Sequence, residues 1–196
     1  IAWKVAEQAK AQGATFTLTN APIAMRMGEI NKLAEACDAT VIPADATSVE
    51  DLENLITQSM EVLGGKIDFI LHSIGMSPNV RKGKPYHGTN YDWYHKTMDV
   101  SAMSLHKVLQ VAKKMDAINE WGSVVALTYI AAQRVFPDYN DMADAKSLLE
   151  SITRSFGYHY GEAKKVRVNT ISQSPTVTTA GSGVKGFDEF ISFSEQ

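Results

Sequence analysis

Hydrophobic residues recur along this chain at two alternating spacings, one typical of helices and the other typical of strands. Residues 1–9 repeat apolar side chains at helical spacing, and Gly13 is expected to end that helix. Residues 14–20 then alternate as a strand, with Phe16 and Leu18 on one side. Ser48, with Asp51 three residues later, matches the capping pattern of a helix that runs to 63. The pattern predicts further helices over residues 25–37, over a segment ending near 115, and from 137 to about 165.

Apolar runs between these helices predict further strands over residues 40–43, 67–74, 123–130 and 166–172, and a polar loop covers residues 76–89. Pro43 favours a place at a sheet edge for the first of these strands. Residues 67–74 are almost continuously apolar, which is typical of a strand buried on both faces. Strands that alternate with helices indicate a parallel sheet wrapped by helices. We therefore expect an α/β fold with a doubly wound, Rossmann-like parallel sheet, as a single domain over residues 1–196.

The two ends of the chain depart from that fold. A doubly wound sheet that binds a dinucleotide starts with a strand and a glycine-rich turn, whereas the pattern here starts inside the first helix. Residues 186–196 read as a helix that no strand follows. We therefore expect the first and the last strand of the fold to be missing from this sequence, as in a fragment.

Charge and cysteine content narrow the class of protein. The net charge of −3 carries no nucleic-acid signature. Cys37 is the one cysteine of the sequence, so an internal disulfide is excluded, and no Cys/His cluster has zinc spacing. We expect a metal-free site in a reducing compartment. No apolar run reaches 18 residues and no signal segment opens the chain, so the expected location is cytoplasmic, away from membranes.

Two tyrosines and a lysine stand where an apolar strand gives way to a helix. Tyr139 and Lys146 are seven residues apart, and on a helix that begins at Pro137 they would lie on one face, roughly 10 Å apart along the axis. A neutral phenol beside a carbonyl oxygen stabilises the charge that hydride addition creates there, and supplies a proton. A lysine cation nearby favours the phenolate. Tyr129 adds a second phenol. The alternative is an interfacial aromatic residue and a solvated lysine.

Four motifs carry a resemblance to a known family. They are HSIG at residues 72–75, LTY at 127–129, PxYNxMxxAK at 137–146, and RVNxIS followed by SPTVTT. The chain resembles, over essentially all 196 residues, the NAD(P)-dependent enoyl-acyl-carrier-protein reductases of bacterial fatty-acid synthesis, a branch of the short-chain dehydrogenases. Other short-chain dehydrogenases usually have Asn-Ala-Gly in place of Ser-Ile-Gly, a serine near Tyr129, and tyrosine four residues before lysine.

The longer spacing also has a physical interpretation. A ketoreductase protonates the oxygen on the carbon that receives hydride, whereas an enoyl reductase delivers hydride to the β-carbon and stabilises the thioester carbonyl oxygen farther away. One more helical turn moves the phenol by about 5 Å in the required sense. Two other readings stay open: a short-chain oxidoreductase acting on ketones or alcohols, and a dinucleotide-binding module without turnover.

The resemblance assigns roles to individual residues. Tyr139 stabilises the enolate, Lys146 holds the nicotinamide ribose, and Tyr129 is the second tyrosine beside the thioester. The residues implied at the cofactor are Ile1, Ala21, Asp45, Ala46, Ser73, Ile74, Gly75, Lys146, Pro175, Thr176, Val177, Thr178, Thr179 and Ala180. Those implied at the acyl chain are Met76, Ser77, Tyr129, Met142, Val184 and Phe187, for each of which core packing is the alternative.

Cofactor and partners follow from the resemblance more than from the residues. Asn20 stands where NAD enzymes often carry an acidic residue, and Arg26 suits a 2′-phosphate or an outer helix face. NADH is the expected cofactor, with NADPH as the alternative. The expected substrate is an enoyl thioester on acyl carrier protein, which Arg81, Lys82 and Lys84 would meet unless they are simply solvated. The family also implies a homotetramer.

Overall fold

The computed structural model describes residues 1–173, in which helices and parallel strands alternate. The α-helices are α1 (Ala2–Ala11), α2 (Glu29–Cys37), α3 (Val49–Leu63), α4 (Pro78–Arg81), α5 (Tyr91–Met98), α6 (Ser104–Lys114) and α7 (Asn140–Lys164). The strands are β1 (Thr17–Leu18), β2 (Thr40–Val41), β3 (Ile67–His72), β4 (Ile118–Thr128) and β5 (Arg167–Ser172). The other elements of the described residues are short 3-10 turns and one π-helix. The 3-10 turns are η1 (Pro22–Met27), η2 (Tyr86–Gly88), η4 (Ile130–Ala132) and η5 (Pro137–Tyr139), and the π-helix is η3 (Asp99–Met103). The predicted Rossmann-like α/β class is confirmed.

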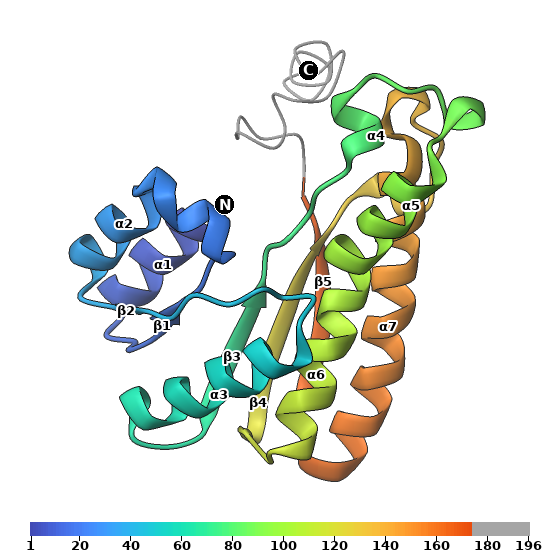
Figure 1. Ribbon diagram of the computed structural model, residues 1–196. Coiled ribbons are helices and arrows are strands. Elements are labelled where there is room, and N and C mark those ends of the chain that lie inside the picture. The colour runs from blue at the N-terminus through green and yellow to red at the C-terminus, as the bar shows by residue number, and fades with distance from the viewer. Residues whose placement is uncertain (174–196) are drawn as a thin grey trace.

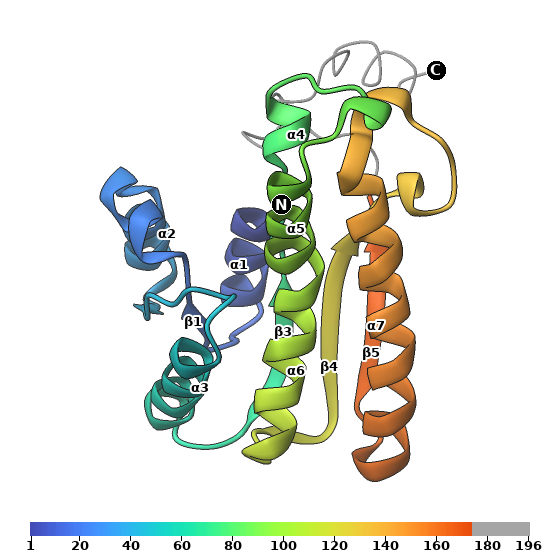
Figure 2. The same ribbon diagram turned by 45° about the vertical axis from the view of Figure 1, so that its right-hand side comes forward.

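The strands form two parallel groups, β1-β2 and β3-β4-β5. In the classic doubly wound order 3-2-1-4-5-6, β2 and β1 match places 3 and 2. Strands β3, β4 and β5 match places 4, 5 and 6. The place between β1 and β3 holds no strand of residues 1–173. Helix α3 contacts both β1 and β3, and so joins the two groups. Helices α6 and α7 lie side by side over one face of β3-β4-β5 (Figures 1 and 2).

Two hydrophobic clusters hold these layers together. The larger one lies between β3-β4-β5 and the helices α3, α6 and α7, and includes Leu105, Leu109 and Leu149 with no exposed surface. The smaller one joins α1 to α2 through Ala6, Leu33 and Cys37, with Trp3, Phe16 and Leu18 packed against it. Cys37 therefore acts as a small apolar residue. Within residues 1–173 no helix is both long and apolar enough to span a bilayer.

Several predicted boundaries need correction. The strand expected over 14–20 is reduced to β1, which pairs only with β2. The helix expected over 25–37 is divided, because Gly28 adopts a positive φ of 71° between η1 and α2. The strand expected to be buried on both faces is only partly buried, since Ile67 and His72 are buried whereas Phe69 is 40% exposed. The Ser48 cap is confirmed, since its Oγ accepts a hydrogen bond from the Asp51 amide.

Candidate functional site

The carboxyl ends of the parallel strands bring the predicted chemistry to one edge of the sheet. Residues 73–77 follow β3 and Tyr129 follows β4, while α7 starts at the same edge (Figure 1). Open α/β sheets place ligands outside this edge, because the loops after neighbouring strands meet there. The residues around Tyr129, Tyr139 and Lys146 are therefore the candidate site.

Tyr129 and Tyr139 face one another as a pair of half-buried rings. Their centroids are 5.0 Å apart with the ring planes at 53°, and Phe136 packs on Tyr129 at 5.3 Å. Burial raises the pKa of both phenols above its ordinary value near 10. Both phenols are consequently neutral at physiological pH. Each carries a proton that can be donated to an oxygen in front of it.

Lys146 on α7 is buried at the end of β4, the strand that Tyr129 follows. Its side chain is 7% exposed, and Nζ donates a hydrogen bond of 2.7 Å to the carbonyl oxygen of Leu127 at the end of β4. Burial lowers the pKa of Lys146 to about 8. A Cβ placed on Gly75 would lie 3.9 Å from this Nζ and 3.3 Å from Cε of Met142. The structure thus brings together three predicted residues, Gly75, Met142 and Lys146.

The start of α7 differs from the prediction. The 3-10 turn η5 includes Tyr139, and the α-helix begins only at Asn140, so Tyr139 and Lys146 do not lie on one continuous helix. Asn140 has φ 40° and ψ −136°, outside the regions usual for a residue with a side chain. Such a conformation costs about 1 to 3 kcal/mol and persists only where its surroundings impose it. The helix predicted to begin at Pro137 therefore begins at Asn140, and the common face of Tyr139 and Lys146 stays a prediction.

A buried polar network surrounds Asn140 in that conformation, and no pattern in the sequence predicts this network. Asn140 donates from Nδ2 to the Lys84 carbonyl oxygen at 2.6 Å and accepts from Thr89 at 2.9 Å. Asp141 accepts from Ser77 at 2.5 Å and from Asn79 at 2.7 Å. The loop expected over 76–89 thereby contains α4, which Ser77 caps. Serine followed by proline at the first helical position was the one local signal for this helix.

The π-helix η3 supports the loop after β3 from the other side. Ser101 bonds through its Oγ to both the amide and the carbonyl of Met76. Ser104 follows η3, and its Oγ lies 2.8 Å from Nε2 of His72, the last residue of β3. Burial lowers the pKa of His72 to about 3, so the ring is neutral. A π-helix of this kind often marks a functional region.

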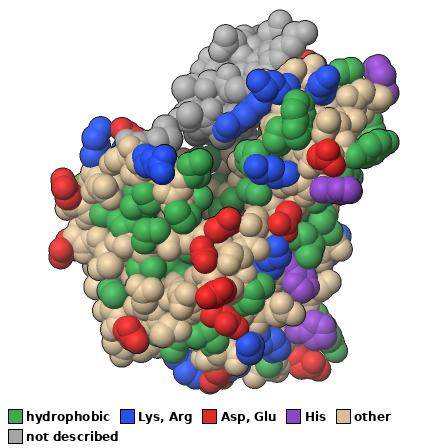
Figure 3. Space-filling model, in the orientation of Figure 1, with side chains coloured by type: hydrophobic (Ala, Val, Ile, Leu, Met, Phe, Trp, Pro, Cys, Tyr) green, Lys and Arg blue, Asp and Glu red, His purple; other side chains and the backbone are tan. Residues whose placement is uncertain are grey.

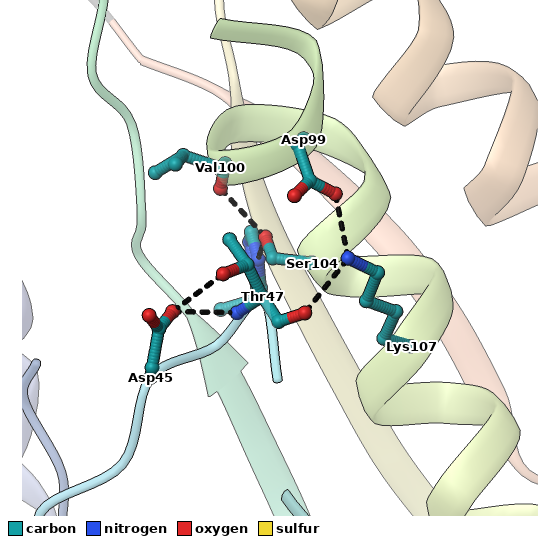
Figure 4. A network of polar contacts seen from close by, with 7 residues as sticks. Asp45, Thr47, Asp99, Val100, Ser104 and Lys107 are labelled. Carbon is teal, nitrogen blue, oxygen red and sulfur yellow. Dashed lines mark hydrogen bonds and ion pairs between the residues drawn. The ribbon is translucent and has the colours of Figure 1, made fainter. Parts of the chain in front are cut away.

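Asp45 lies in a separate network at the end of β2 (Figure 4). Its carboxylate accepts from the amide of Thr47 at 2.9 Å and from the hydroxyl at 2.7 Å, and these bonds lower its pKa. Lys107 then joins the Thr47 carbonyl to Asp99, which begins η3. Asp45 is exposed, so its carboxylate still faces solvent. The loop of Asp45 is thereby fixed to the helices that support the site.

The remaining predicted residues divide into two groups. Ile1 is the N-cap of α1, Ala21 precedes η1, Ala46 is half-buried beside Asp45, and Ser73 and Ile74 follow β3. No predicted ligand contact of these residues is tested by the geometry. Among residues 1–173 no three His, Cys, Asp or Glu side chains are grouped to hold a metal ion. The predicted residues that lie outside the described part of the chain are Pro175, Thr176, Val177, Thr178, Thr179, Ala180, Val184 and Phe187.

Comparison with known proteins covers the whole sequence. A family model described as enoyl-(acyl carrier protein) reductase matches residues 1–196. Enoyl-acyl-carrier-protein reductase (NADH) 1 of Rhizobium meliloti is 33% identical over 100% of this chain and 70% of its own length. Enoyl-acyl-carrier-protein reductase (NADH) 2 of the same organism is 30% identical over 100% and 72%. The crystal structure of the FabI-NADH complex from Alistipes finegoldii is 65% identical, with a TM-score of 0.97 over 99% of this chain and 69% of that chain.

Proposed function

Because this chain belongs to the enoyl-(acyl carrier protein) reductase family, we propose that Tyr139, Tyr129 and Lys146 carry out its reaction. The reaction is the reduction of the trans-2 double bond of an enoyl thioester with NADH, in fatty-acid synthesis. The single observation that supports these residue roles is the pair of neutral phenols, 5.0 Å apart between ring centroids, at the end of the strand to which the buried Lys146 is bonded through Leu127. The ketone-reducing and non-catalytic alternatives are not favoured by any relative named above.

The residues around Nζ of Lys146 fit a nicotinamide cofactor. Gly75 leaves space beside Nζ of Lys146 that any larger side chain would fill with its Cβ. The Lys146 ammonium is a donor suited to a ribose hydroxyl, and its bond to Leu127 holds it in place. Asp45 and Ala46, fixed by Thr47, would face the adenine. When bound, the cofactor supplies the hydride.

Tyr139 would act on the thioester carbonyl oxygen. When hydride adds to the β-carbon, electrons move through the conjugated system and negative charge develops on this oxygen. A buried neutral phenol that donates a hydrogen bond to the oxygen stabilises the charge more strongly than water does, and it holds the proton that the product needs. Burial keeps the Tyr139 phenol protonated for this role. Tyr129, in ring contact with it, would orient the thioester as the second tyrosine.

Met76, Met142, Val184 and Phe187 would surround the acyl chain. Met142 supports this role through its place beside Gly75, because a flexible thioether adapts to an apolar chain. Ser77, also predicted at the substrate, has its hydroxyl committed to Asp141 and to the amide of Val80. Its proposed contribution to the substrate site is therefore the backbone and loop that it holds.

A comparison of two substrates tests the proposed function. We expect NADH oxidation with crotonyl thioester to exceed that with acetoacetyl thioester by about 10²-fold or more in kcat/KM, because the phenols serve an oxygen remote from the hydride-accepting carbon. The measurement is NADH absorbance with the full gene product, and butyryl thioester is the inert control. Ketone reduction at an equal or higher rate would contradict the proposal.

An acyl carrier protein would dock beside α4. Arg81, Lys82 and Lys84 are exposed at the end of α4 and just after it. Figure 3 shows Lys and Arg side chains gathered at the top of the face it displays, the end of the molecule where α4 lies. The Lys84 carbonyl is bonded to Asn140, next to Tyr139, so this basic loop borders the site. Complementary charge at such a border speeds the arrival of an acidic partner.

Charge reversal at this loop separates carrier docking from chemistry. We expect Arg81→Glu/Lys82→Glu to raise KM for crotonyl-acyl carrier protein by about tenfold, and to leave the uncharged crotonyl-N-acetylcysteamine thioester within twofold of wild type. The matched control is Lys113→Glu/Lys114→Glu at the end of α6, just before the start of β4 and so at the opposite edge of the sheet, which changes net charge equally. Equal effects on both substrates, or no effect on the carrier substrate, would remove this loop from docking.

Three expectations beyond the site belong to the same proposal. A single domain over residues 1–196 is supported by α3, which contacts strands of both groups. A homotetramer is proposed from the family resemblance. Tyr158 on α7 and Ile171 on β5, both more than half exposed, are apolar side chains that a second copy would cover. A cytoplasmic location is proposed because fatty-acid elongation of this type uses soluble carrier-bound substrates.

A further inference from the structure

We propose that Asp141 is a positioning residue that sets the place of the Tyr139 phenol by joining the loop after β3 to the start of α7. This inference rests on the proposed function, since it concerns the same phenol. Asp141 has no exposed surface, and it stands two residues after Tyr139. Its carboxylate bonds to Ser77 and Asn79 of the loop rather than to either tyrosine. Its influence on the reaction must therefore pass through the backbone.

The Asp141 carboxylate uses one oxygen for each of two buried donors. Oδ1 accepts from the Ser77 hydroxyl at 2.5 Å, and Oδ2 accepts from Nδ2 of Asn79 at 2.7 Å. Ser77 and Asn79 are themselves 3% and 0% exposed. Bonds to a carboxylate are stronger than those between neutral groups, and a buried donor left without an acceptor is costly. The carboxylate thus holds the N-cap residue of α4 and the second residue of that helix.

Asn140 fastens the same joint at the residue between Tyr139 and Asp141. Its Oδ1 accepts from the Thr89 hydroxyl at 2.9 Å and from the Asp141 amide at 2.5 Å, and its Nδ2 donates to the Lys84 carbonyl at 2.6 Å. These bonds surround a residue with a positive φ of 40°. The direction in which the chain leaves Tyr139 is therefore determined by the loop of residues 77–90.

The second half of this loop is anchored to the first. Asn90 donates from its amide to Oδ1 of Asn79 at 3.0 Å and accepts from Nδ2 of Asn79 at its carbonyl oxygen at 3.1 Å. Asn90 also caps α5 through the Trp93 amide. Asn79 therefore connects Asp141 on α7 to the start of α5. A fully bonded buried network of this kind allows one arrangement of its parts.

Positioning matters here because a phenol is effective only at hydrogen-bond distance from the oxygen it serves. A displacement of about 1 Å at such a group is enough to lower a rate by about 10²-fold. An apolar core contact between α4 and α7 would provide stability without fixing direction to this precision. The hydrogen bonds of Asn140 and Asp141 lie at the first two residues of α7, directly after Tyr139.

The test compares Asp141→Asn with Asp138→Asn in the full gene product. The amide has one acceptor oxygen where the carboxylate has two, so one buried donor loses its acceptor. We expect kcat for crotonyl thioester to fall by about tenfold or more with KM for NADH within twofold of wild type. Asp138 is exposed and precedes Tyr139 directly, so the same change there is expected to leave kcat within twofold. Ser77→Ala, a smaller change, should lower kcat about threefold and decides the matter if Asp141→Asn does not fold.

The Tyr139→Phe background distinguishes positioning from general damage. If Asp141 acts through the phenol, Asp141→Asn should cause less than a twofold further loss of kcat once the phenol hydroxyl is absent. An undiminished further loss, or an Asp141→Asn enzyme within twofold of wild type, would overturn the inference. Neither result would affect the proposed function, which fails separately if the wild-type protein does not reduce the enoyl thioester.

Discussion

Replacement of Tyr139 by phenylalanine is expected to lower kcat for crotonyl thioester by about 10² to 10⁴-fold, the usual contribution of a positioned proton donor. The reason is that the ring and its contact with Tyr129 remain, whereas the hydroxyl assigned to the thioester oxygen is lost. KM for NADH should stay within about twofold, since the hydroxyl acts mainly as charge develops. Steady-state NADH absorbance measures both values.

The matched control is Tyr158→Phe on α7, where the residue is 65% exposed. This variant should keep the wild-type rate. Tyr129→Phe should have an effect between those of the two other substitutions, because its phenol is less buried and is assigned the second place. An unchanged kcat in Tyr139→Phe would remove this phenol from the mechanism, whatever the outcome for Tyr129.

Replacement of Lys146 by methionine is expected to lower kcat/KM by about 10²-fold and to raise KM for NADH. Methionine fills similar volume but provides no charge and no donor for a ribose hydroxyl. Arg154→Met on the exposed side of α7 removes a cation from the same helix and should have little effect. Equal losses in the two variants would show that Lys146 contributes only through net charge or helix stability.

The pH profile provides an independent test of Lys146. Its pKa of about 8, lowered by burial, means that the ammonium is present below pH 8 and is lost as pH rises through this value. Since the ammonium is the active form, wild-type kcat/KM should decline above about pH 8. Lys146→Met should lack this decline. A wild-type profile that rises through pH 8 would contradict the role given to the cation.

The sequence alone predicted which residues meet at this edge of the sheet better than it predicted their local conformation. Motif spacing identified Tyr129, Tyr139 and Lys146, and the order of strands placed them at one sheet edge, because parallel strands end on the same side. Gly75 and Met142, predicted for different ligands, do lie together beside Lys146. These successes depend on local patterns and on the fixed geometry of parallel sheets.

The start of α7 shows what local patterns omit. Pro137 is a good first helical residue, so a helix from that point was the natural prediction. The structure instead has a positive φ at Asn140, where the side chain bonds to the Lys84 carbonyl and the Thr89 hydroxyl across more than 50 positions of sequence. No periodicity records such contacts. The same holds for Asp141, whose acidic side chain in a first helical turn would be read as solvated.

The π-helix η3 and the short length of β1 could not be predicted from the sequence for the same reason. Residues 99–103 fit an ordinary helix by their apolar spacing, whereas the structure has a π-helix there, from which Ser101 bonds to Met76. Residues 14–20 alternate correctly for a strand, but only Thr17 and Leu18 pair, because β2 is the sole partner among the described residues. Strand length depends on pairing, which the alternation does not contain.

The position of the transferred hydrogen in the product shows whether hydride is delivered to the β-carbon of an enoyl thioester. NADH carrying deuterium at the transferred position is oxidised with crotonyl thioester by the full gene product, and the acyl product is analysed by mass spectrometry and NMR. Enoyl reduction by the proposed mechanism should yield butyryl thioester with one deuterium on the β-carbon and solvent hydrogen on the α-carbon. Unreduced crotonyl thioester, together with deuterium on the carbinol carbon of 3-hydroxybutyryl thioester when acetoacetyl thioester is offered instead, would contradict it.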